Sequence, residues 1–231
     1  MSGSRDRRSR DLGIACLLLA GVTALFEFTN FDLALQDKFY NPATGRWLVD
    51  VDEPVGRAIF YNGPKIFVWV VGVTLLTLVA GPARWREKLR FERRGLWLAL
   101  LVLISTLAAA GAGKEYANVF CPSETRRYGG QVAYAKLCEP FPAGDRPARR
   151  GKCFPAGHAS GGFALMGLLA LRSSRRWRRG AVWLGLGLGW WMGLYQMLKG
   201  AHYLSHTLTT LLLAWIAVLV WQRVLQIAPA E

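Results

Sequence analysis

The chain has 231 residues, of which 52% are hydrophobic, and its formal net charge is +14 at pH 7. This hydrophobic share is too high for an ordinary soluble domain of this length. The positive charge could indicate a nucleic-acid partner, but almost every basic cluster adjoins an apolar run, which is the pattern of membrane topology. The composition therefore predicts a membrane protein, whose partner is the bilayer and not a nucleic acid.

Six apolar runs approach the roughly 20 residues that a helix needs to cross a membrane. In chain order they cover residues 12–31, 65–83, 95–113, 157–171, 180–198 and 203–221. The first run has the basic start of a signal peptide but no clear cleavage site, so we expect a retained helix. The fourth is the weakest, and hydropathy alone would also permit a buried or re-entrant helix there. We expect an all-α fold in which residues 1–231 form one membrane-embedded domain, a bundle of six transmembrane helices.

Arginine in the short connections predicts the orientation of these helices. The N-terminal segment and the second and fourth connections are dense in Arg, so we expect them and both termini to be cytoplasmic. The two longer connections, about 32–64 and 114–156, would then lie outside. The sequence thus predicts a multi-pass protein of the bacterial inner membrane whose outer loops face the periplasm. The second outer loop is also basic, but long loops constrain topology only weakly, so its charge needs a reason other than topology.

Three of the four cysteines, Cys121, Cys138 and Cys153, fall in this second outer loop. In an oxidising compartment two of them could form a disulfide, but the sequence does not indicate which two. Three free thiols are the alternative. A zinc site is not expected, because the loop has no C-x-x-C spacing.

All three histidines are predicted to lie at the outer membrane face. His158 opens the fourth helix after a Pro-Ala-Gly turn, where the free N–H groups of the helix start form an anion site. His202 and His206 are four residues apart, so they share one helix face and one ring can orient the other. Metal or haem ligation uses the same spacing, and histidines that merely lie at the interface are a further alternative.

Together these segments resemble the type 2 phosphatidic acid phosphatase superfamily, whose motifs read KxxxxxxRP, PSGH and SRxxxxxHxxxD. Lys114 and Pro122 fit the first motif at the correct separation, His158 ends the second, and His202 stands at the histidine of the third. The order of the motifs, their spacing and their predicted membrane side all agree between residues 114 and 206.

Several motif positions nevertheless differ from the family pattern. The changes are Cys121 for Arg, Ala156 for Ser, Tyr195 and Gln196 for Ser-Arg, and His206 for Asp. Two guanidinium groups that would bind phosphate are therefore missing. We expect other cations to replace them, chiefly Arg127, Arg150, Lys152 and Lys199.

The resemblance implies a phosphatase that uses no metal or cofactor. His202 would attack phosphorus and form a phosphohistidine, His158 would protonate the leaving oxygen, and His206 would orient His202. Lys114 and the backbone N–H groups around Gly157 would stabilise charge on the phosphoryl oxygens.

The implied substrate is an amphiphilic phosphorylated lipid. Lipid A and polyprenyl diphosphate are the leading candidates, followed by phosphatidylglycerol phosphate and phosphatidic acid. Three other readings stay open: phosphotransfer to a lipid acceptor, a degenerate member that binds anionic lipid without turnover, and a bis-His cytochrome or metal protein.

Overall fold

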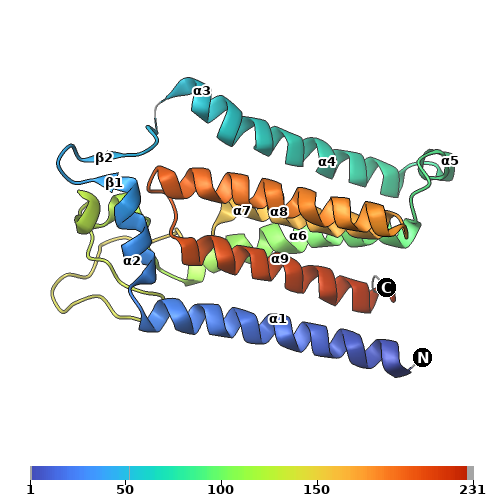
Figure 1. The fold of residues 1–231 in the computed structure, drawn as a ribbon, viewed down its shortest axis with the longest axis horizontal. Helices are drawn as coiled ribbons and strands as arrows, with labels where there is room; N and C mark the ends of the chain where they lie inside the picture. The colour runs from blue at the N-terminus through green and yellow to red at the C-terminus, as the bar shows by residue number, and fades with distance from the viewer. Residues whose placement is uncertain (1, 52, 228–231) are drawn as a thin grey trace.

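The computed structural model describes residues 2–51 and 53–227, and within these ranges the chain is mostly helical, as predicted (Figure 1). The main helices of the bundle are α1 (Ser2–Phe28), α4 (Gly63–Ala80), α6 (Arg93–Tyr116), α7 (Gly157–Ala164), α8 (Arg175–Leu198) and α9 (Leu204–Val224). Two of them have extensions: a π-helix, Arg57–Asn62, precedes α4, and a 3-10 helix, Leu165–Leu171, continues α7.

The remaining elements are short. They are α2 (Phe31–Gln36), α3 (Pro54–Gly56), α5 (Ala83–Lys88), the antiparallel strands β1 (Tyr40–Asn41) and β2 (Arg46–Trp47), and the 3-10 turns Asp37–Phe39, Pro122–Glu124 and Arg126–Tyr128. All of them lie between main helices in the sequence, and all except α5 lie at one end of the bundle (Figure 1).

Within residues 2–51 and 53–227, four helical segments are long and apolar enough to cross a membrane, so the chain is a membrane protein. They are Ser9–Phe28, Pro54–Ala80, Arg93–Tyr116 and Leu204–Val224. The other two predicted spans also form helices, but α7 with its 3-10 continuation is a shorter apolar helix, and α8 is a continuous helix that is not among the four candidate spans. Six crossings therefore stay a prediction, whereas helices at all six places are observed.

The second span begins about ten residues earlier than predicted. The apolar run predicts a span over residues 65–83 and an outer loop over about 32–64. In the structure, Glu53 accepts hydrogen bonds from the backbone N–H groups of Val55 and Gly56 and caps a helix that starts at Pro54. The π-helical turn before Gly63 lets the helix continue past Pro64, whose nitrogen has no proton to donate.

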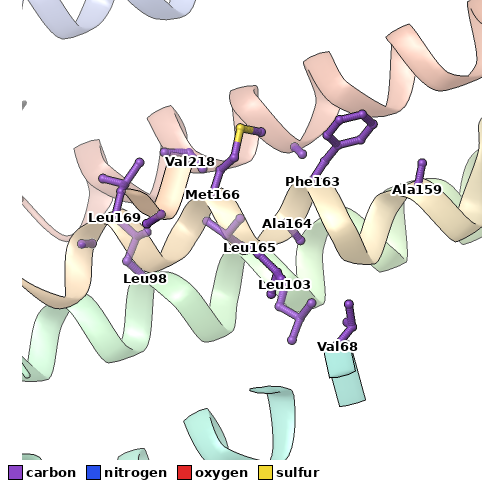
Figure 2. Close-up of a cluster of buried hydrophobic side chains, with 14 of the residues drawn as sticks. Val68, Leu98, Leu103, Ala159, Phe163, Ala164, Leu165, Met166, Leu169 and Val218 are labelled. Carbon is purple, nitrogen blue, oxygen red and sulfur yellow. The ribbon is translucent and has the colours of Figure 1, made fainter. Parts of the chain in front are cut away.

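Helix α7 lies at the centre of the bundle, packed on α6, α8 and α9. Ala159 and Phe163 of α7, with Leu165 and Met166 of its 3-10 continuation, are almost fully buried (Figure 2). A helix surrounded by other helices does not need the length or hydropathy of a lipid-facing span. This burial explains why hydropathy alone left the fourth segment ambiguous.

Glycines on α8 allow α7 and α9 to approach closely. A Cβ on Gly189 would lie 2.2 Å from the ring of Phe163, and one on Gly193 would lie 2.5 Å from Thr207. Because lipid tails are as apolar as Leu, membrane helices associate through such close contacts more than through the hydrophobic effect. The Gly-rich sequence of α8 is therefore a packing surface.

The two ends of the bundle differ in charge and in complexity. Figure 1 shows both chain ends and α5 at one end, and α2, the β1–β2 hairpin and the long segment between α6 and α7 at the other. We call the second one the loop end. The Arg-rich connections thus share the end opposite the loops, which is the arrangement that the charge pattern predicts.

Candidate functional site

The first part of the site is where α6 ends and α7 begins, at the loop end. A Cβ on Gly157 would lie 2.8 Å from Lys114 Nζ, so the absence of a side chain lets the ammonium group rest against the start of α7. Free N–H groups at a helix start attract anions, and the ammonium group strengthens that attraction.

His158 follows directly on α7. Its ring packs on Tyr61 with 4.5 Å between the ring centroids, and its Nδ1 atom is buried without a hydrogen bond among the described residues. A buried ring nitrogen with no protein partner is suited to exchange a proton with a bound molecule.

His202 lies in the tight connection between α8 and α9. Gly200 ends α8 with φ of +74°, a conformation that favours Gly, and the backbone N–H groups of Ala201 and His202 both donate to the carbonyl of Gln196. The ring of Trp47 from β2 packs against Gly200, where a Cβ would lie 2.2 Å from it. The Gln196 carbonyl and the Trp47 ring therefore both fix this turn. His202, which the turn carries, is only 3% exposed.

The three histidine rings converge. Nδ1 of His202 lies 3.4 Å from Nδ1 of His206, and the ring centroids of His158 and His202 are 6.4 Å apart. Cys153 Sγ also lies 3.4 Å from His202 Nδ1. The Nδ1 side of His202 is thus occupied by protein, which leaves Nε2 available to a ligand.

Burial controls the charge of His202. Removal from water, followed by the nearby His206 and Lys114, holds the pKa of His202 well below its usual value of 6.5. The ring is therefore neutral at physiological pH and keeps a lone pair, as a nucleophile requires.

A model of the PAP2 superfamily matches residues 95–228, which is more than half of the chain. The chain belongs to the PAP2 superfamily. The resemblance seen in the sequence motifs is thereby confirmed, and membership indicates a phosphatase acting on phosphate esters. Neither a curated protein nor a solved structure matches the chain.

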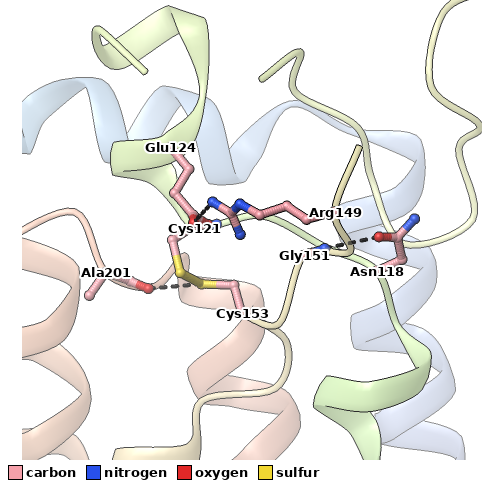
Figure 3. A network of polar contacts seen from close by, with 7 residues as sticks. All are labelled: Asn118, Cys121, Glu124, Arg149, Gly151, Cys153 and Ala201. Atoms are coloured by element: carbon pink, nitrogen blue, oxygen red, sulfur yellow. Dashed lines mark hydrogen bonds and ion pairs between the residues drawn. A yellow bond between two sulfur atoms is a disulfide. The ribbon is translucent and has the colours of Figure 1, made fainter. Parts of the chain in front are cut away.

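The first departure from the PAP2 motifs, Cys121, forms a disulfide with Cys153 (Figure 3). The pairing that the sequence left open is therefore 121–153, while Cys16 and Cys138 are free and exposed. Cys153 Sγ also lies 2.9 Å from the carbonyl oxygen of Ala201. Where a typical PAP2 protein has a phosphate-binding Arg, this chain has a covalent link that touches the turn carrying His202.

The second departure, Ala156, is joined to α9 through its backbone. Its N–H donates to the carbonyl of His206 at 3.2 Å, and its carbonyl accepts from Thr210 Oγ1 at 3.2 Å. Because Thr210 Oγ1 also bonds to the His206 carbonyl, the second and third motifs are held together without the missing Ser hydroxyl.

Two lysines lie near His158 besides Lys114. Lys199 Nζ lies 5.0 Å from the ring centroids of both Tyr61 and Tyr195, and Lys65 Nζ lies 6.0 Å from that of Tyr61. Lys65 shares a cavity with Lys114 and His158. Lys65 is not among the site residues predicted from the sequence, although an ionisable residue at the mouth of an apolar helix is a signal that points to such a role.

The structure gives other partners to three cations that were expected to bind phosphate. Arg127 pairs with Asp37 at 2.6 Å and Lys152 with Glu115 at 2.7 Å, while Arg150 donates to the carbonyl of Tyr116 at 3.0 Å. The same loop holds two further ion pairs, Arg126–Asp145 and Arg149–Glu124. These contacts account for much of the loop's positive charge, and they give the predicted phosphate role of Arg127, Arg150 and Lys152 no support.

Proposed function

We propose that this protein is a membrane phosphatase that hydrolyses a lipid phosphate monoester or diphosphate, of the lipid A or polyprenyl diphosphate type. The reaction would take place at the periplasmic face of a bacterial inner membrane. The observation that carries the lipid assignment is a cavity of about 580 Å³ between α4, α6 and α7.

This cavity is polar at one end and apolar along the rest. Lys65, Lys114 and His158 line the polar end. The apolar part is lined by Val68, Trp69, Gly72, Val73, Leu76, Leu100, Leu103, Ile104, Leu107 and Ala110. Several of these side chains are largely exposed although they lie in the middle of apolar helices, so they face lipid. A phosphate with a hydrocarbon tail matches this distribution, because the head would meet the cations and the tail would remain in an apolar surrounding.

The histidine geometry supports a two-step reaction. His202 Nε2 would attack phosphorus and give a phosphohistidine, while His158 protonates the leaving oxygen. His158 would then take a proton from the water that releases phosphate. Since His206 Nδ1 lies next to His202 Nδ1, it can accept a hydrogen bond from the N–H at His202 Nδ1 and so select the tautomer with a lone pair on Nε2.

Three lysines are the best candidates for the missing guanidinium groups. Lys65, Lys114 and Lys199 would stabilise the negative charge that the phosphoryl oxygens carry in the transition state. We assign phosphate binding to Lys65, and no longer to the loop cations Arg127, Arg150 and Lys152, because Lys65 lines the same cavity as His158.

A phosphate-release assay on the purified protein tests this function. The panel covers lipid A, undecaprenyl diphosphate, phosphatidylglycerol phosphate and phosphatidic acid, with glycerol 3-phosphate as a substrate without a tail. We expect turnover of at least one lipid, no turnover by His202→Ala, and poor turnover of glycerol 3-phosphate. Failure of the wild type on every lipid would count against the proposal.

Two glycine variants test whether the cavity binds the hydrocarbon tail of the substrate. Gly111 lines the cavity and Gly187 does not, and a Cβ added to either glycine would meet no atom within 4 Å. We expect Gly111→Phe to raise KM for long-chain lipid phosphates while it spares a short-chain phosphate ester, and we expect Gly187→Phe to change neither. Equal behaviour of the two variants on long-chain substrate would contradict the assignment of the cavity to the tail.

A further inference from the structure

Three potential metal ligands meet behind the proposed nucleophile. Cys153 Sγ, a ring nitrogen of His202 and one of His206 all lie within 4.8 Å of one another, and all three residues are buried. Cys153 is bonded to Cys121 in the structure, so its sulfur is not a free thiolate there. Reduction of this bond would release two sulfur ligands beside two imidazoles.

The distances already match those of a zinc site. With Zn–N of about 2.0–2.1 Å and Zn–S of about 2.3 Å, tetrahedral geometry puts two nitrogens about 3.3 Å apart and a nitrogen and a sulfur about 3.5 Å apart. The corresponding distances are 3.4 Å between Nδ1 of His202 and Nδ1 of His206, and 3.4 Å between Cys153 Sγ and His202 Nδ1. Two edges of the tetrahedron are therefore present before any metal binds.

We infer that reduction of the Cys121–Cys153 disulfide converts this cluster into a Zn²⁺ site with the ligands Cys153, His202, His206 and Cys121. A phosphine reductant supplies two electrons to the S–S bond and takes up the oxygen of water, whose protons go to the two thiols. When Zn²⁺ binds, both thiols lose their protons. Cys121 is the half-buried end of the disulfide, which gives a reductant access.

Metal binding would disable the nucleophile. A neutral imidazole has one nitrogen with a lone pair and one with a proton. If Nδ1 of His202 binds Zn²⁺, Nε2 carries the proton and has no lone pair for phosphorus. The intact disulfide would then protect the enzyme from metal inhibition. This consequence rests on the proposed function, whereas the metal site itself does not.

Cobalt binding tests the site without any assay of activity. The protein carries Cys16→Ser and Cys138→Ser, which remove only the exposed free thiols. We expect no Co²⁺ binding before reduction, and after reduction one Co²⁺ per chain with a sulfur-to-cobalt charge-transfer band. Confirmed reduction without this band would overturn the inference.

Two serine variants distinguish the loss of a metal ligand from the loss of the disulfide bond. Cys121→Ser and Cys153→Ser both break the same bond, but only Cys153→Ser removes the sulfur that contacts His202. We expect Cys121→Ser to bind Co²⁺ without reductant and Cys153→Ser to bind it at least about tenfold more weakly. Equal affinities would overturn the inference even if either variant were less stable than the parent.

An activity measurement on the wild type then tests the inhibition. We expect Zn²⁺ to inhibit lipid phosphate hydrolysis only after reduction, and EDTA to restore it. If cobalt binds as expected but no lipid is hydrolysed, the metal site stands and the proposed function fails. Inhibition by Zn²⁺ that does not depend on reduction would contradict the link between the disulfide and the metal.

Discussion

At the scale of single residues, His206 is the departure that tests the mechanism most directly. In the family motif an Asp at this position accepts a hydrogen bond from the nucleophile, and here a ring nitrogen lies 3.4 Å from His202 instead. A neutral ring can accept that bond but cannot supply negative charge to a developing imidazolium. His206 should therefore orient His202 more than it stabilises its charge.

We predict that His202→Ala abolishes turnover, and that His206→Ala lowers kcat/KM only by about ten- to a hundredfold, or roughly 1.4 to 2.7 kcal/mol. Steady-state kinetics on the best lipid of the panel measure both effects. His206→Asp is the matched control, because it restores the family residue and should retain or raise activity. A fully active His206→Ala would remove the orienting role.

The pH dependence should also reflect the burial of the nucleophile. An exposed imidazole would lose its lone pair near pH 6.5, but burial holds the pKa of His202 well below that value. A group with a lowered pKa stays unprotonated until the pH falls through that lower value. We therefore predict that the acid limb of kcat/KM lies well below pH 6.5, as a profile from about pH 4 to 9 would show. An acid limb at pH 6.5 would mean that His202 is more hydrated than its surroundings indicate.

The residues of the site could be predicted only where the sequence places them by spacing. His158, His202 and His206 came from motif spacing and helix periodicity, which act locally. Lys65 was missed because its place depends on how α4 packs against α7. The contact between Asp32 and the start of α9 could not be predicted for the same reason: Asp32 accepts hydrogen bonds from the N–H and hydroxyl of Ser205, which is 173 residues away. Asp32 is buried, and its removal from water raises its pKa to about 6 although the hydrogen bonds from Ser205 act in the opposite direction.

At the scale of helices, apolar runs in the sequence predict well where a helix forms, but they predict its first and last residues less well. All six predicted segments are helical, but α4 has an N-terminal extension that begins at Pro54, and α7 ends in 3-10 geometry. High hydropathy is typical of helices that face lipid, so it predicts α4 and α6 more clearly than α7, which is enclosed by other helices. The loop ion pairs could not be foreseen, because Arg127 and Asp37 are 90 residues apart.

The packing of α8 gives a prediction at this scale. A Cβ on Gly189 would collide with the buried ring of Phe163, whereas one on Gly187 would meet nothing within 4 Å. We predict that Gly189→Ala destabilises the protein by about 1 to 3 kcal/mol, the usual cost of overpacking. Gly187→Ala should be neutral or slightly stabilising, since Ala favours the helix. Melting temperatures in detergent compare the two, and an equal effect of both would show that α8 tolerates a wider separation.

At the scale of the whole molecule, the Arg-rich connections and the histidines of the candidate site lie at opposite ends of the bundle. Figure 1 shows the Arg-rich connections at the end opposite the loop end, and the histidines lie at the start of α7 and at the connection between α8 and α9. Basic residues remain preferentially on the cytoplasmic side of a membrane, so this separation predicts the direction in which the site opens. A site that opened to the cytoplasm would require these connections to be exported against that preference.

Native and engineered cysteines can test this orientation. In a Cys16→Ser background, Cys138 is the one remaining free thiol, and it is exposed in the long loop. We predict that a membrane-impermeant maleimide labels Cys138 in intact spheroplasts. With Cys138→Ser added and Arg84→Cys introduced in the exposed α5, labelling should occur only after the membrane is permeabilised. Because both thiols are on exposed surfaces at opposite ends, a difference in labelling reports the side of the membrane and not burial. Labelling of Arg84→Cys but not of Cys138 in intact spheroplasts would reverse the orientation and place the phosphatase site in the cytoplasm.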